Sequence, residues 1–76
     1  MLILSRAQAL AYYKASSDAK MLGGMCDMVF KTRHYRISIR QFEMEDVIIT
    51  FTSDDFVRSE EYTSLEDWAN AYAFYL

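Results

Sequence analysis

Apolar and polar residues alternate along three short segments in the middle of this chain, and this period of two limits most strongly what it can fold into. The segments are residues 26–31, 35–40 and 47–52. Because successive side chains of a strand point to opposite faces, each segment predicts a β-strand with one apolar and one mainly polar face. The apolar set is Met28, Phe30, Tyr35, Ile37, Ile39, Val47, Ile49 and Phe51.

The register between these strands follows from keeping the apolar side chains on one face. A tight turn at residues 33–34 and a three-residue loop at residues 43–45 both achieve this. Arg-His lacks the glycine or asparagine that a two-residue turn favours, so a longer first turn is the alternative. The opposed pairs expected are Met28 with Ile39, Phe30 with Ile37, Thr32 with Tyr35, Asp27 with Arg40 and Lys31 with Arg36 in the first hairpin, and Ile39 with Ile49 and Ile37 with Phe51 in the second.

Helical periodicity precedes the strands. Ser5 is expected to cap a helix over residues 6–15, because its hydroxyl can accept a bond from an otherwise unpaired helix amide. One side of this helix, at helical spacing, consists of Ala7, Leu10, Ala11 and Lys14.

A second helix is expected at the end of the chain, after a linker that contains Phe56 and Val57. Its start is a capping box, either Thr63-x-x-Glu66 or Ser64-x-x-Asp67. Its apolar stripe is Leu65, Trp68, Ala69, Tyr72 and Leu76. The sequence therefore predicts one α+β domain over residues 1–76, a three-stranded antiparallel meander with N-terminal and C-terminal helices packed on one face (αβββα).

A single cysteine and a single histidine limit the chemistry. Cys26 has no second cysteine for an internal disulfide, and with His34 it supplies too few ligands for structural zinc. The two residues lie at opposite ends of the first predicted strand and turn, roughly 26 Å apart at 3.3 Å per residue, which is too far for a nucleophile and its base. Adjacent carboxylates point in different directions and have no nucleophile beside them. We expect no enzyme, no cofactor and no bound metal.

The apolar runs at residues 1–4 and 47–49 are too short to cross a bilayer or to form the core of a signal peptide. One free cysteine suits a reducing compartment, so a cytoplasmic location is expected. Without a disulfide or a metal, so small a chain depends on a rich core or on self-association, and a homo-oligomer is one expectation.

Charge is divided unevenly along the chain, although the net charge is only −3. Residues 1–40 hold seven basic and two acidic residues, whereas residues 41–76 hold one basic and nine acidic residues. This asymmetry of charge between the two halves bears on the partners of the chain. Tyrosines are also numerous, and a tyrosine can lie either at the rim of a core or at an interface.

The leading hypothesis is a non-enzymatic, protein-binding inhibitor or adaptor. Clustered carboxylates can present a phosphate-like field to a basic, nucleic-acid-binding surface of a host or cognate protein. In general character the chain is similar to small anti-defence accessory proteins of phages and mobile elements. The expected partner-binding residues are Asp54, Asp55, Glu60, Glu61, Tyr62, Glu66 and Asp67.

The alternative is a small nucleic-acid-binding module that uses the polar face of the sheet. Its candidate residues are Lys31, Arg33, Arg36 and Arg40. A sheet that binds single strands usually adds exposed aromatic side chains for stacking on bases. Here the aromatic residues of the predicted strands lie on the apolar face of the sheet, opposite the basic residues, so a protein partner is favoured.

Overall fold

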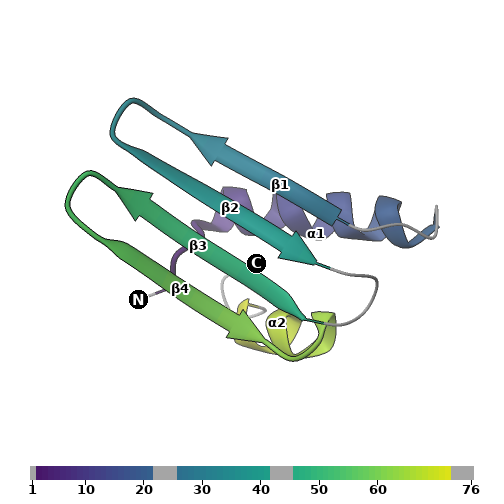
Figure 1. The fold of residues 1–76 in the computed structure, drawn as a ribbon. Coiled ribbons are helices and arrows are strands. Elements are labelled where there is room, and N and C mark those ends of the chain that lie inside the picture. Colours follow the sequence, from purple (N-terminus) through teal and green to yellow (C-terminus); the bar gives the residue numbers. More distant parts are fainter. Residues whose placement is uncertain (1, 22–25, 42–45, 73–76) are drawn as a thin grey trace.

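The fold is a four-stranded antiparallel sheet with a helix before it and a helix after it. The computed structural model describes residues 2–21, 26–41 and 46–72. The elements are α1 (Arg6–Met21), β1 (Cys26–Lys31), β2 (Tyr35–Gln41), β3 (Val47–Ser53), β4 (Val57–Tyr62) and α2 (Leu65–Tyr72). The strands lie in the order β1-β2-β3-β4, and both helices lie behind the sheet in Figure 1. The α+β class is confirmed, but the sheet has a fourth strand that the sequence did not predict.

The predicted strand register is confirmed in both hairpins. In the first, Phe30 is opposite Ile37 and the polar-face pairs are as expected. In the second, Ile39 is opposite Ile49, so the apolar residues of three strands share one face. The predicted loop at residues 43–45 lies outside the described residues.

Both tight turns are held by a hydroxyl side chain. Thr32 Oγ1 accepts hydrogen bonds from the amides of His34 and Tyr35, each at 3.2 Å. Ser53 Oγ likewise accepts from the amides of Asp55 at 3.3 Å and Phe56 at 3.2 Å. These bonds fix the turns locally, which explains how two-residue turns without glycine form.

Strand β4 occupies residues that were expected to form a linker. The side chains of Arg58 and Glu60 take positions on the helix-facing side, opposite Phe51 and Ile49. Apolar alternation is therefore absent from β4, although its backbone pairs fully with β3. Charged residues suit β4 because it is an edge strand, where they discourage pairing with other chains.

The first helix begins as predicted and ends later than predicted. Ser5 Oγ accepts from the Gln8 amide at 3.2 Å while Gln8 Oε1 accepts from the Ser5 amide at 2.9 Å, a reciprocal capping box. Ser16 does not end the helix, because its hydroxyl donates to the carbonyl of Tyr13 at 3.2 Å and is thus satisfied within it.

The side of α1 that packs on the sheet is not the one that Ala7, Leu10, Ala11 and Lys14 form. Ala9 and Tyr12 are buried, whereas Leu10 is 46% exposed. Ala7, Ala11 and Lys14 are also exposed. Tyr12 is preferred in the core because its ring packs edge-on against Trp68 at 4.8 Å and its hydroxyl donates to Gln41 Oε1 at 2.5 Å.

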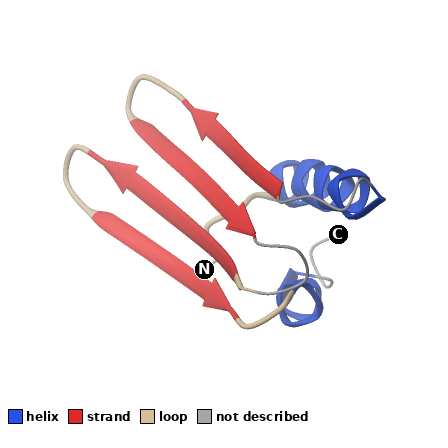
Figure 2. Cartoon of the chain, turned by 45° about the vertical axis from the view of Figure 1, so that its right-hand side comes forward, coloured by secondary structure: helices blue, strands red, loops and turns tan. Residues whose placement is uncertain are grey.

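The second helix starts at the second of the two capping alternatives. Ser64 Oγ accepts from the Asp67 amide at 3.2 Å, and the Ser64 carbonyl accepts from the Trp68 amide at 3.1 Å. Figure 2 shows α1 and α2 on the same side of the sheet. The core between the sheet and the helices consists of Leu4, Ala9, Tyr12, Cys26, Ile37, Ile39, Val47, Ile49, Trp68 and Tyr72.

Candidate binding surface

Neither helix covers the other face of the sheet, which we call the open face. From β1, β2 and β3 it presents the side chains that alternate with the core-facing residues. Through its pairing with β3, β4 adds Val57, Ser59 and Glu61. Val57 is 65% exposed and Ile48 is 38% exposed. The open face therefore offers apolar area beside charged groups.

The charge asymmetry of the sequence becomes an asymmetry across this face. Because the strands lie side by side in chain order, the cations lie on β1 and β2, and Glu61 lies on β4. The open face therefore has one basic and one acidic region, at diagonally opposite corners.

We define the basic corner as Lys31, Arg33 and Arg36, at the turn between β1 and β2. Lys31 and Arg36 are directly opposite each other, and Arg33 lies in the turn beside them. All three are exposed. They line a shallow hollow of about 180 Å³ together with His34.

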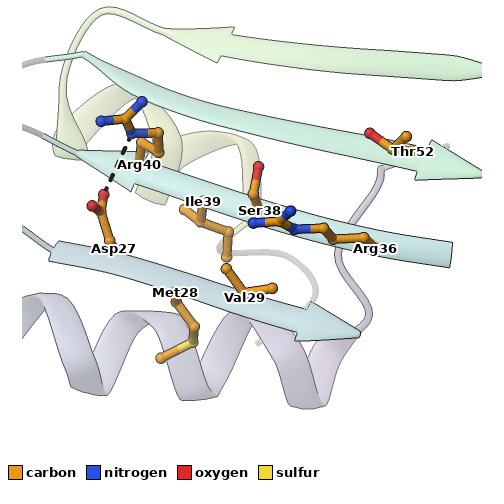
Figure 3. Close-up of a pocket in the computed structure, with 8 residues that line it drawn as sticks. All are labelled: Asp27, Met28, Val29, Arg36, Ser38, Ile39, Arg40 and Thr52. Carbon is orange, nitrogen blue, oxygen red and sulfur yellow. Dashed lines mark ion pairs between the residues drawn. The ribbon is translucent and has the colours of Figure 1, made fainter. Parts of the chain in front are cut away.

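A larger hollow of about 440 Å³ adjoins the basic corner along β2. Figure 3 shows it with Arg36 and Ser38 on β2 and Thr52 on β3. At its other end Arg40 Nε forms an ion pair with Asp27 Oδ1 at 3.8 Å. The fold thus brings together all four residues of the alternative, nucleic-acid-binding set.

We define the acidic corner as Asp46, Ile48 and Glu61, at the opposite end of the open face. These residues line a hollow of about 250 Å³ with Tyr62 and Thr63. Ile48 and Glu61 are opposite each other on β3 and β4. The hydroxyl of Thr63 hydrogen-bonds to the carboxylate of Asp67 in α2, which links the hollow to the helix start.

The leading set of partner-binding residues is only partly brought together. Glu61, Tyr62 and Asp67 lie at or beside the acidic corner, and Glu66 is exposed in the first turn of α2. Asp54 and Asp55 lie in the β3–β4 turn at the other end of the sheet. Asp46 and Ile48 were not predicted as site residues, because only the register of β3 with β4 places them beside Glu61.

Glu60 takes part in the interior instead of the surface. Its side chain is 12% exposed and accepts hydrogen bonds from the Ile3 amide at 3.2 Å, the Tyr62 hydroxyl at 3.3 Å and the Tyr72 hydroxyl. Arg58 forms an ion pair with it at 3.6 Å. Glu60 therefore joins the N-terminal segment, β4 and α2, and it is not available to a partner in the folded chain.

The tyrosines divide between core and surface. Tyr12 and Tyr72 are buried, Tyr62 is half-buried and Tyr13 is exposed. Burial raises the pKa of the Tyr12 hydroxyl, and burial followed by the hydrogen bond to Glu60 raises the pKa of the Tyr72 hydroxyl. Tyr12 and Tyr72 are therefore part of the core, and they do not belong to an exposed interface.

Cys26 is buried at the start of β1, and His34 is exposed in the turn at the far end of that hairpin. Burial and then the charge of Asp27 raise the pKa of the Cys26 thiol, which disfavours the reactive thiolate. Within residues 2–21, 26–41 and 46–72, no three His, Cys, Asp or Glu side chains are grouped so as to hold a metal ion.

No known protein family, curated protein or solved structure matches this chain. Across the part of the chain that the structure describes, neither helix has the length and apolar character needed to span a membrane.

Proposed function

We propose that this chain is a non-enzymatic protein-binding inhibitor or adaptor that contacts its partner through the acidic corner. The observation that carries the proposal is the hollow at Asp46, Ile48 and Glu61, in which a partly exposed apolar side chain lies beside two carboxylates. Apolar centres with polar rims are characteristic of protein interfaces.

The charge of the acidic corner indicates the kind of partner. Neither Asp46 nor Glu61 forms an ion pair within the described residues. Unpaired carboxylates attract a basic surface, such as the nucleic-acid-binding surface of a host protein. Anti-defence accessory proteins of phages and mobile elements are the class of protein that would act in this way.

Charge reversal at the acidic corner tests the proposal. The double variant Asp46→Lys with Glu61→Lys is compared with Asp54→Lys with Asp55→Lys, which makes the same change of net charge at the far end of the sheet. Each tagged protein is used for capture from nuclease-treated host lysate. We expect one stoichiometric basic protein that the first variant loses and the second retains. Equal capture by both variants would contradict the proposal.

The apolar part of the surface has its own matched pair. Ile48→Ala removes the side chain from the acidic corner, and Val57→Ala removes an apolar side chain elsewhere on the open face. Truncating a residue at the centre of an interface costs more than 1 kcal/mol in binding, or roughly fivefold or more in Kd. We expect that loss for Ile48→Ala alone; a comparable loss for Val57→Ala would refute the assignment of Ile48 to the centre.

A further inference from the structure

The basic corner contains an arrangement that stabilises neither the hairpin nor the core. Lys31 and Arg36 are directly opposite each other on the open face, and like charges in this position are destabilising. No ion pair involves either residue within the described parts of the chain. A bound anion between them would remove the repulsion.

Neutral hydrogen-bond donors lie beside these cations. The two hollows of β2 adjoin at Arg36 and Thr52, which line both of them, and Ser38 lines the larger. Arginine, lysine and hydroxyl side chains are the groups that contact phosphate oxygens in nucleic-acid complexes. Asp27 and Asp54 stand at the outer ends of the hollows, so the favourable region for an anion is the middle, around Arg36.

The cations form a row instead of a single pocket. Arg33 precedes Arg36 in the turn, and Arg40 follows Arg36 on the same face of β2, about 13 Å away at 3.3 Å per residue. The larger hollow extends from Val29 of β1 to Thr52 of β3, a width of about 10 Å, or two strand spacings. A row of this length and width fits one linear polyanion.

We infer that the basic corner and the adjoining hollow of β2 bind the phosphate backbone of single-stranded nucleic acid. The described strand positions of the open face carry no aromatic side chain on which a base could stack, and the two rings at the site, His34 and Tyr35, line only the smaller hollow at the turn. Binding therefore relies mainly on phosphates and is independent of base sequence. The site shares no residue with the acidic corner, so its test stands apart from that of the protein-binding proposal.

The test is fluorescence anisotropy with a labelled oligothymidylate of about twelve nucleotides, a length within the range that one small domain covers. The variant Lys31→Gln with Arg36→Gln removes two charges from the basic corner. The control, Arg6→Gln with Lys14→Gln, removes two charges from exposed positions on α1. Thermal unfolding of both variants reports on the fold, and relief of the Lys31–Arg36 repulsion should leave the first at least as stable as the parent.

We expect the parent to bind at about 50 mM salt and to weaken steeply at about 200 mM. Loss of two phosphate contacts should weaken binding at least tenfold and reduce the slope of log K against log salt by about 1.4, at 0.7 per contact for single strands. The control should bind as the parent does. Equal loss in the control, no binding at low salt, or equally effective competition by polyglutamate would overturn the inference.

Discussion

Replacement of Glu60 by alanine should destabilise the fold far more than replacement of its neighbour. The Glu60 carboxylate accepts hydrogen bonds from the Ile3 amide and from the Tyr62 and Tyr72 hydroxyls. A hydrogen bond to a charged group contributes roughly 1.5–3 kcal/mol, and the partners left unpaired in the interior add to the loss. If only the bonds from Ile3 and Tyr72 are counted, at about 1.5 kcal/mol each, Glu60→Ala lowers the free energy of unfolding by about 3 kcal/mol.

That loss is large for this chain. At 0.05–0.15 kcal/mol per residue, 76 residues have a free energy of unfolding of about 4–11 kcal/mol. The melting temperature should fall by about 12 °C or more, at 4–8 °C per kcal/mol for a domain of this size. The fall is measured by urea and thermal unfolding, with the fluorescence of the buried Trp68 as the signal.

Glu61→Ala is the matched control, because Glu61 is exposed on the open face one residue away. Its cost should be within about 0.5 kcal/mol of zero, as for most surface substitutions. Equal melting temperatures for the two variants would refute the structural role of Glu60.

Two further predictions concern the alkaline limit of stability and the turns. The pKa of the Tyr72 hydroxyl is raised by burial and by its bond to Glu60, so the unfolded chain loses this proton first, near pH 10. The contribution of this proton to the free energy of unfolding should be fully present below about pH 10 and should be lost as the pH rises above it. Tyr72→Phe should therefore make the urea midpoint fall less steeply with pH above about pH 10. An unchanged slope would contradict this. Ser53→Ala removes the hydroxyl that holds the β3–β4 turn, and it should cost about 1 kcal/mol in urea unfolding. An unaltered midpoint would show that the turn does not need the hydroxyl.

The strand register could be predicted because it depends on side-chain parity. A slip of one residue would turn Ile37 and Ile39 to the open face, so only one register buries them. Strand β4 could not be predicted in this way, because its helix-facing positions include Arg58 and Glu60 instead of apolar residues. Their hydrogen bonds and ion pair, which no pattern of hydropathy contains, make those positions tolerable.

A local signal for the missed hairpin does exist. The first turn reads Thr32-Arg33-His34-Tyr35 and the second reads Ser53-Asp54-Asp55-Phe56, each with a hydroxyl before two polar residues and an aromatic residue after them. The hydroxyl makes equivalent bonds in both. Recognising the repeat would have placed β4 against β3 and would have assigned Glu60 and Glu61 to opposite faces.

The candidate sites were harder to predict because they depend on long-range pairing. The basic residues lie on one hairpin, so the alternation of side chains along its two strands is enough to place them on one face of the sheet. The acidic corner combines Asp46 and Ile48 at the start of β3 with Glu61 at the end of β4, and it requires the register of β3 with β4. Proximity along the chain was misleading for Asp54 and Asp55, which the β3–β4 turn carries to the other end of the sheet.

The central claim, that the acidic corner is the partner-binding surface, is tested most directly by an NMR footprint. The ¹⁵N-labelled chain is titrated with the protein captured from lysate, and its amide signals are followed. Binding at the acidic corner predicts shifts or broadening centred on Ile48, Glu61 and Tyr62, with the exposed side of α1 unaffected. Shifts confined to α1 or to the β3–β4 turn, with these three residues unperturbed, would contradict it.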